Sequence, residues 1–229
     1  MLFLAVFCGF LAENQREHIV EHQREKKYIA MLYEDLKNDT VDLKRDTAWW
    51  PNTIKRIDTI RMEIEKSEKE RNYLLLYRKA GAIRNYNNFE YHDRTIQQLK
   101  NGGNFRLIRN RAIADSLMNY DAKILTELKD QETQSNAIYQ QVNFIQDKII
   151  NSKYFNLIAD STTPQFDSVF KKEPAIFSLS SADKTDVMQY YNHLEYYRRM
   201  SNYRLGTMKR LCHMAVNLIK LLEKEYHLK

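Results

Sequence analysis

A stripe with helical spacing, apolar at all but one position, runs through the C-terminal part of the chain. Successive members lie almost always three or four residues apart, which places them on one face of an α-helix. They are Val187, Tyr190, Leu194, Tyr197, Ser201, Leu205, Met208, Leu211, Ala215, Leu218 and Leu222. The pattern predicts one long helix over about residues 181–227, with a seam typical of coiled coils and helical bundles.

The rest of the chain is expected to be helical as well. Glycine (5) and proline (3) are scarce among the 229 residues, a composition that favours long helices over sheets. Apolar spacing predicts helices over about residues 13–48, 52–79, 88–101 and 110–150. The first should end before Pro51, the third should end at Gly102-Gly103, and Asn110 should cap the fourth.

Residues 151–180 contain two prolines and are expected to form an irregular connection that packs across the helices. The predicted fold is therefore all-α. We expect an elongated antiparallel bundle with long coiled-coil-like helices, which forms a single helical domain over residues 13–229.

The first twelve residues carry no charged side chain, and charge begins abruptly at Glu13. A secretory signal is disfavoured because no Lys or Arg precedes the apolar run. The run is also shorter than the about 20 apolar residues of a spanning helix. Two interpretations remain, a buried core helix and the end of a membrane-spanning helix whose beginning is missing. We favour the second, because nothing between Phe10 and Tyr28 breaks a helix and an anchor would continue directly into a polar stalk.

The anchor hypothesis assigns residues 1–12 to the lipid bilayer, with the polar residues from Glu13 to Arg16 at the headgroups. The side chains expected to contact lipid are Leu2, Phe3, Leu4, Val6, Phe7, Phe10 and Leu11. Nothing basic precedes this segment, and four basic residues follow it: Arg16, Arg24, Lys26 and Lys27. By the positive-inside rule, the chain as it stands would keep its helical domain in the cytoplasm.

One short motif has the spacing of a zinc hydrolase. His18-Ile19-Val20-Glu21-His22 matches H-x-x-E-H, in which two histidines bind zinc and the glutamate activates water. A zinc hydrolase also needs a third ligand and a shaped cleft, whereas this motif follows an apolar run on a highly charged helix. We therefore interpret His18 and His22 as a surface pair that binds metal adventitiously at most, and we predict no metal centre.

A second candidate site surrounds a glycine pair. Gly102 and Gly103 are followed by Arg106, Arg109 and Arg111, which could bind an anion through guanidinium groups and backbone N–H groups. The stretch matches neither a Walker loop nor a dinucleotide fingerprint. We favour a structural elbow between two helices, because glycine after a helix is a common stop signal.

The remaining polar features point to no chemistry. Neighbours such as Tyr91 and His92 in Glu90-Tyr91-His92-Asp93 diverge on a helix, and the group is interpreted as a solvated face. The net charge of +6 is modest and its acidic and basic residues are interleaved, so no nucleic-acid partner is predicted. No cofactor and no catalytic residue is predicted either.

Two stretches carry a resemblance to a known group of proteins. The opening FLAVFCGFLAENQREHIVEHQREKKYIAMLYEDLKNDT and the later TIQQLKNGGNFRLIRNRAIADSLMNYD resemble uncharacterised bacterial proteins with one membrane-spanning helix near the N-terminus and a helical domain after it. The likeness covers about residues 2–45 and 94–125. In that group a Lys-containing segment precedes the apolar run, which implies the inner membrane of a bacterium with the helical domain in the periplasm.

Two functions follow from these observations. The first is a non-enzymatic, membrane-tethered scaffold that binds a partner protein or a second copy of itself through its apolar stripes. The alternative is a sensor that binds an anionic ligand at the Gly102-Gly103 elbow and its arginines. An enzyme ranks third, because a structural role explains each candidate nucleophile, carboxylate pair or metal cluster better than a catalytic role does.

Overall fold

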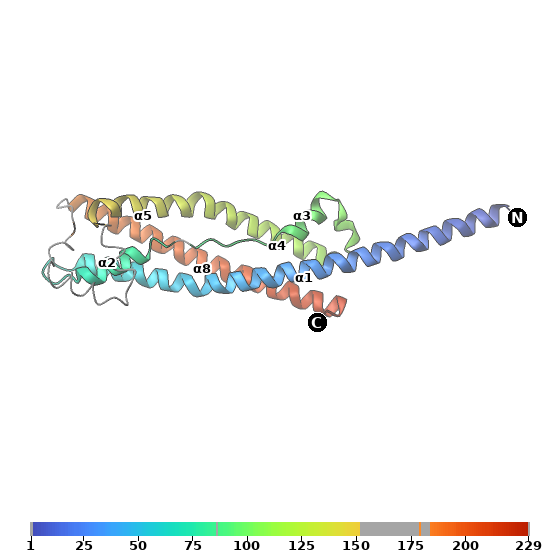
Figure 1. Ribbon diagram of the computed structural model, residues 1–229, viewed down its shortest axis with the longest axis horizontal. Coiled ribbons are helices and arrows are strands. Elements are labelled where there is room, and N and C mark those ends of the chain that lie inside the picture. The colour runs from blue at the N-terminus through green and yellow to red at the C-terminus, as the bar shows by residue number, and fades with distance from the viewer. Residues whose placement is uncertain (1, 86, 152–178, 180–183, 229) are drawn as a thin grey trace. The chain divides into compact units, whose positions relative to one another are not determined.

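The computed structural model describes residues 2–85, 87–151, 179 and 184–228. These residues form helices and connections without a strand, so the all-α prediction is confirmed (Figure 1). The helices are α1 (Leu2–Glu65), α2 (Tyr73–Ala82), α3 (Arg94–Asn101), the 3₁₀ helix η1 (Asn104–Leu107), α4 (Arg111–Asp130), the π-helical turn η2 (Gln131–Ser135), α5 (Asn136–Ile149) and α8 (Lys184–Tyr226).

Several boundaries follow the sequence pattern. The Asn110 side chain accepts hydrogen bonds from the N–H groups of Ala112 and Ile113 at 3.1 and 3.3 Å, as expected for the cap of α4. Helix α3 ends just before the glycine pair, and α4, η2 and α5 together occupy the predicted 110–150 helix. Nearly all of the connection predicted at 151–180, and the beginning of the helix predicted at 181–227, lie outside the described residues.

The first helix passes straight through the position where the sequence predicts its end. Helix α1 continues across Pro51 to Glu65, so the predicted helices at 13–48 and 52–79 do not occur with those limits. Proline inside a helix removes one backbone hydrogen bond and costs about 3 kcal/mol. Trp50, Ile57 and Ile60 around this point are buried in the core, and burying each large apolar side chain gains about 1.5–3 kcal/mol, enough to offset the proline.

The described contacts divide the chain into two compact units. Unit 1 consists of Met1–Lys44, Glu90–Thr126 and Lys209–Lys229, and unit 2 of Arg45–Phe89 and Glu127–Met208. Helices α1, α4 and α8 contribute to both units. Each unit is described by itself below.

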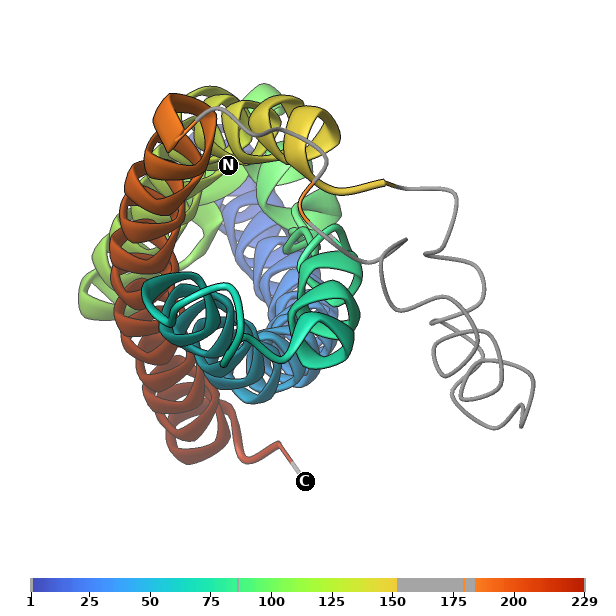
Figure 2. The ribbon, with the colours of Figure 1, turned by 90° about the vertical axis from the view of Figure 1, so that its left-hand side faces the viewer.

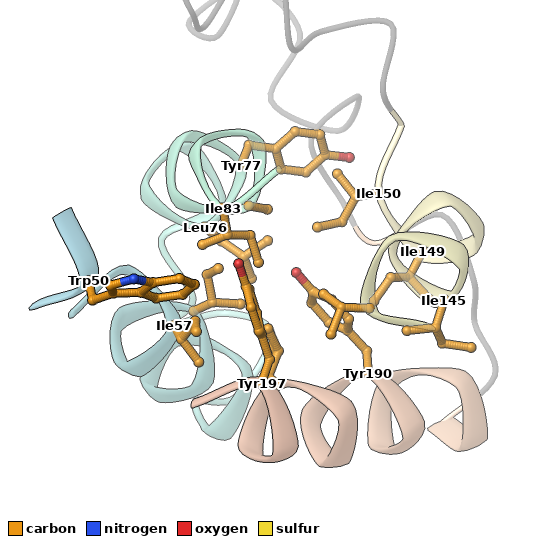
Figure 3. Close-up of a cluster of buried hydrophobic side chains, with 14 residues drawn as sticks. Trp50, Ile57, Leu76, Tyr77, Ile83, Ile145, Ile149, Ile150, Tyr190 and Tyr197 are labelled. Atoms are coloured by element: carbon orange, nitrogen blue, oxygen red, sulfur yellow. The ribbon is translucent and has the colours of Figure 1, made fainter. Parts of the chain in front are cut away.

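The core of unit 2 is built from four helices. In Figure 2, α2, α5 and the unit 2 parts of α1 and α8 surround a common interior. Figure 3 shows Trp50 and Ile57 from α1 facing Ile145 and Ile149 from α5 across this interior, while Tyr190 of α8 stands between them. The Tyr190 hydroxyl donates to the Gln146 side chain at 2.7 Å, which satisfies its polar atom inside the core.

The core of unit 1 is formed by α1, α3, α4 and the last part of α8. Its fully buried apolar side chains include Ile29, Leu32, Leu36, Leu43, Leu99, Ile113, Leu117, Ile124, Leu211, Ala215 and Leu222. The residues from α8 belong to the predicted stripe, and those from α1 lie three, four or seven residues apart. The pattern of apolar spacing therefore identified the buried face of both helices.

The beginning of α1 has a different environment. Phe3 is 80% exposed and Phe10 is 69% exposed. In the described part of the chain, this segment therefore does not pack in a core. None of the described helices combines the length and the apolar character that crossing a bilayer requires.

Candidate functional site

Three buried carboxylates project from the inner face of α1 in unit 1. Glu25, Asp35 and Asp39 are each at most 7% exposed. They lie among the apolar side chains Leu32 and Leu36 of the same face. A buried carboxylate costs several kcal/mol unless it is hydrogen-bonded, so the partners of these three groups define what the site does.

Asp35 and Asp39 bind the segment that enters α3. Asp35 accepts a hydrogen bond from the Thr95 N–H at 3.1 Å, and Asp39 accepts one from the His92 N–H at 2.9 Å. The N-cap residue of α3, Asp93, makes no capping bond through its own side chain. Carboxylates from α1 therefore satisfy N–H groups at the start of α3, where the helix dipole also favours negative charge.

Asp39 and a further buried carboxylate, Asp121 of α4, bind two tyrosines. The Tyr120 hydroxyl donates to Asp39 at 2.9 Å, and the Tyr91 hydroxyl donates to Asp121 at 3.0 Å. Lys100 forms an ion pair with Asp121. Burial, with the neighbouring carboxylates, raises the pKa of both tyrosines far above its ordinary value. Both phenols therefore stay protonated and act as hydrogen-bond donors.

The network corrects one interpretation of the sequence. Glu90-Tyr91-His92-Asp93 was expected to be a solvated face, but Tyr91 and His92 are half-buried and bonded to carboxylates. The expectation assumed that these residues lie on a helix, whereas α3 begins only at Arg94. The segment before Arg94 is irregular, so helical spacing does not set its side-chain directions, and Tyr91 contacts Asp121 while His92 contacts Asp39.

Glu25 joins three parts of unit 1. Its carboxylate accepts hydrogen bonds from the Arg109 N–H at 2.8 Å and the Tyr226 hydroxyl at 2.7 Å, and lies 3.1 Å from Nδ1 of His22. Burial alone would raise the pKa of Glu25, but the bonds from Arg109, Tyr226 and His22 together hold it below its ordinary value. The carboxylate stays charged and fixes the entrance of α4 and the end of α8 to α1.

The three arginines after the glycine pair contact different groups. Arg106 lies 3.4 Å from Glu21, and Arg109 lies 3.7 Å from Glu25 and donates to the His18 carbonyl at 3.1 Å. The Arg111 side chain is 93% exposed and lies 3.8 Å from Asp115. The described geometry gives each arginine its own carboxylate, and their anion binding stays a prediction.

The residues of the H-x-x-E-H motif are also separated by their partners. Glu21 faces Arg106 and His22 faces Glu25, while His18 is exposed. Across the described part of the chain, no three His, Cys, Asp or Glu side chains come together as a metal site.

Unit 2 holds one fully buried arginine. Arg204 of α8 lies with its guanidinium 4.6 Å from the ring centre of Trp50. Its Nη2 donates to the Gln131 side chain, and its Nε lies 3.6 Å from the buried Glu127 carboxylate. This cluster joins α1, α4, η2 and α8 by charge and stacking inside an otherwise apolar core.

The glycine pair makes the turn that leads into η1. Gly103 has φ of +61°, a left-handed conformation that residues with a Cβ rarely adopt. Its backbone N–H bonds to the Lys100 carbonyl at 3.2 Å, which closes the end of α3. The elbow interpretation of this stretch therefore has a conformational basis.

We expect Gly103→Ala to lower the free energy of unfolding by about 1 kcal/mol, because alanine strains the left-handed backbone. Chemical denaturation followed by circular dichroism measures the change. Gly9→Ala is the matched control, because Gly9 lies in a helix and its added Cβ would meet no atom within 4 Å. An equal loss of stability in both variants would contradict the assignment to backbone strain.

The pairings in unit 1 indicate a structural role for its buried carboxylates. Hydroxyl, amide and ammonium donors bind buried carboxylates from another segment, an arrangement that holds a fold rigidly in one register.

Comparison of the chain with protein families, curated proteins and solved structures found no match.

Proposed function

We propose that this protein is a non-enzymatic helical scaffold that the apolar beginning of α1 holds at a lipid bilayer. One observation carries the proposal. Phe3, Leu4, Val6, Phe7, Phe10 and Leu11 are all exposed, although no charged residue lies among them. The sequence assigns Leu2 to the same anchor, but its side chain lies outside the described part of the structure. A concentrated apolar surface of this kind is typical of a binding site for lipid or protein.

The distribution of these side chains favours lipid over a protein partner. A helix that docks in a protein groove presents one apolar stripe and keeps a polar opposite face. Here the large exposed apolar side chains cover about half of the helix circumference, and the opposite side carries Cys8, Gly9 and Ala12, so no face of this segment is polar. Glu13 and Arg16 follow as an exposed ion pair at 2.6 Å, at the boundary expected for headgroups.

The helical units supply the scaffold. Their inner faces are fixed by buried polar clusters, and exposed apolar side chains such as Met118, Phe144 and Met188 remain available for a partner protein or a second copy. The resemblance of the opening segment supports a bacterial inner membrane with the helical units in the periplasm. No substrate or cofactor enters the proposal.

The tether is tested by placing charge in it. We expect the triple variant Leu4→Glu, Phe7→Glu and Leu11→Glu to leave the membrane fraction of the cell, whereas the unaltered chain stays there. Each charged side chain in the hydrocarbon region costs about 2–4 kcal/mol, which exceeds what the remaining apolar residues contribute. Cell fractionation and flotation with phosphatidylethanolamine–phosphatidylglycerol vesicles measure the distribution.

A matched variant replaces three exposed apolar residues outside this segment, with Met62→Glu, Met118→Glu and Phe144→Glu. It should float with the vesicles as the unaltered chain does. If the unaltered chain does not float, or if both triple variants float equally well, the tether is wrong. Protease added to intact spheroplasts should cut the helical units, and full protection would overturn the periplasmic orientation.

A further inference from the structure

A cavity of about 460 Å³ opens beside the glycine elbow in unit 1. We call it the elbow cavity, and its lining consists of Arg24, Lys27, Tyr28, Met31, Gln98 and Asn104. The volume lies within the range of sites that hold small molecules. The first four residues come from α1, and the other two come from α3 and η1.

The lining is rich in hydrogen-bond donors and contains no acidic residue. Arg24 and Lys27 lie three residues apart, so they share one face of α1. Within the described part of the chain, neither side chain forms an ion pair, in contrast to Arg106 and Arg109 nearby. Two adjacent cations repel each other without an anion between them, and the cavity leaves room for one.

The glycine pair shapes one wall of the cavity. Asn104 follows the elbow, and its side-chain Nδ2 donates to the Tyr28 hydroxyl at 3.2 Å. A Cβ on Gly102 would lie 2.5 Å from this Nδ2 and 3.0 Å from the Gln98 carbonyl, so a side chain there would displace the wall. The Tyr28 oxygen accepts from Asn104, which leaves the hydroxyl proton available to a ligand.

We propose that the elbow cavity binds a water-soluble ligand through a phosphate or pyrophosphate group. A guanidinium group, an ammonium group, a phenol and two amides belong to the residues that line a space without a carboxylate, which matches a group with several acceptor oxygens. The site differs from the arginines that follow the elbow, because its cations come from α1.

The choice of a soluble ligand over a lipid headgroup rests on the proposed tether. Arg24 follows Glu13 by eleven residues on α1, a rise of about 16 Å along the helix axis. If the bilayer surface lies at Glu13 and α1 stands perpendicular to it, the phosphates of the lipid headgroups lie near Glu13. They then do not reach the elbow cavity. The experiment must therefore distinguish a soluble phosphate ligand from the phosphate of a lipid headgroup.

The test is isothermal titration calorimetry of inorganic pyrophosphate into the full chain in a neutral detergent at low salt. We expect saturable binding to the unaltered chain and at least tenfold weaker binding to Arg24→Gln/Lys27→Gln. The control Lys26→Gln/Lys55→Gln removes two exposed positive charges outside the lining and should bind as the unaltered chain does. Circular dichroism melts confirm that each variant is folded.

A third variant tests the wall independently of charge. Gly102→Ala should also weaken pyrophosphate binding, because the added Cβ displaces the Asn104 amide. No binding to the unaltered chain, or equal binding to all variants, overturns the proposal. Binding to phosphatidylglycerol vesicles that needs Arg24 and Lys27, without binding of pyrophosphate, overturns the soluble ligand in favour of a headgroup. The calorimetry uses no bilayer, so a failed tether leaves its outcome interpretable.

Discussion

We expect Arg204→Ala to lower the free energy of unfolding by about 4 kcal/mol, the loss typical of one partner removed from a buried ion pair. The guanidinium is fully buried and stacks on Trp50. Without it, the Glu127 carboxylate stays in the core with its nearby positive charge removed. The cost is mainly the desolvation of Glu127 and the lost packing against the indole, because a truncated arginine also leaves a cavity.

The measurement is urea denaturation followed by tryptophan fluorescence. Both tryptophans, Trp49 and Trp50, belong to unit 2, so the signal reports the unit in which Arg204 lies. The control is Arg199→Ala, whose side chain is 72% exposed and pairs with Glu195 one turn away. Exposed pairs of this kind contribute less than about 1 kcal/mol.

A double variant separates charge from volume. Arg204→Met with Glu127→Gln removes both charges and keeps most of the buried side-chain volume, so it should recover most of the stability that Arg204→Ala loses. A loss below about 1 kcal/mol in Arg204→Ala would contradict the cluster as an energetic centre of unit 2. Equal losses in the single and double variants would assign the effect to the guanidinium contacts with Trp50 and Gln131, rather than to the charge left on Glu127 or to lost volume.

The helices were predictable because their apolar spacing is regular. The stripe from Tyr190 to Leu222 is buried or half-buried as expected, and Asn110 caps α4. Pro51 was misread because the local rule, that proline stops a helix, takes no account of packing. The buried side chains of Trp50 and Ile57 decide the outcome there, and only the tertiary structure shows that they are buried.

The buried polar clusters were missed although the sequence contains a signal for them. Asp39 and Asp46 occupy positions on the same three- and four-residue spacing as Leu36 and Leu43, and Arg204 lies between Ser201 and Met208 on the last stripe. A charged residue on an apolar stripe indicates a buried charge with a partner elsewhere. The identity of that partner requires the fold, since Asp39 binds groups far away in the sequence.

The largest pH dependence in unit 1 is expected from Asp39. Burial raises the pKa of this carboxyl to about 6, although hydrogen bonds from His92 and Tyr120 act in the opposite direction. In the unfolded chain its pKa returns to the ordinary value near 3.8. Between these values the folded state binds more protons, so the contribution of Asp39 to stability is full at low pH and falls as the pH rises through 6.

The expected size of this loss is about 2 kcal/mol between pH 4 and pH 7, because the carboxyl of the unfolded chain is already largely ionised at pH 4. It is isolated by comparison with Asp39→Asn, which keeps the shape of the side chain and an acceptor oxygen for His92 but does not titrate. Its amide NH2 group replaces the oxygen that accepts from Tyr120, so the Tyr120 hydroxyl must accept there instead of donating. Neighbouring titratable groups, among them His92, Asp35 and Asp42, are present in both proteins. Their contributions are largely common, so they cancel to first order in the difference of the two stability curves.

Urea denaturation followed by far-ultraviolet circular dichroism, at intervals from pH 4 to pH 7, provides both curves. The stability of the unaltered chain should fall relative to Asp39→Asn as the pH rises, with most of the change complete near pH 6.5. The exposed Asp115→Asn should run parallel to the unaltered chain. Parallel curves for Asp39→Asn would mean that His92 and Tyr120 fully compensate the burial of the carboxylate. A relative gain in stability would mean that they overcompensate, with Asp39 charged in the folded state down to low pH.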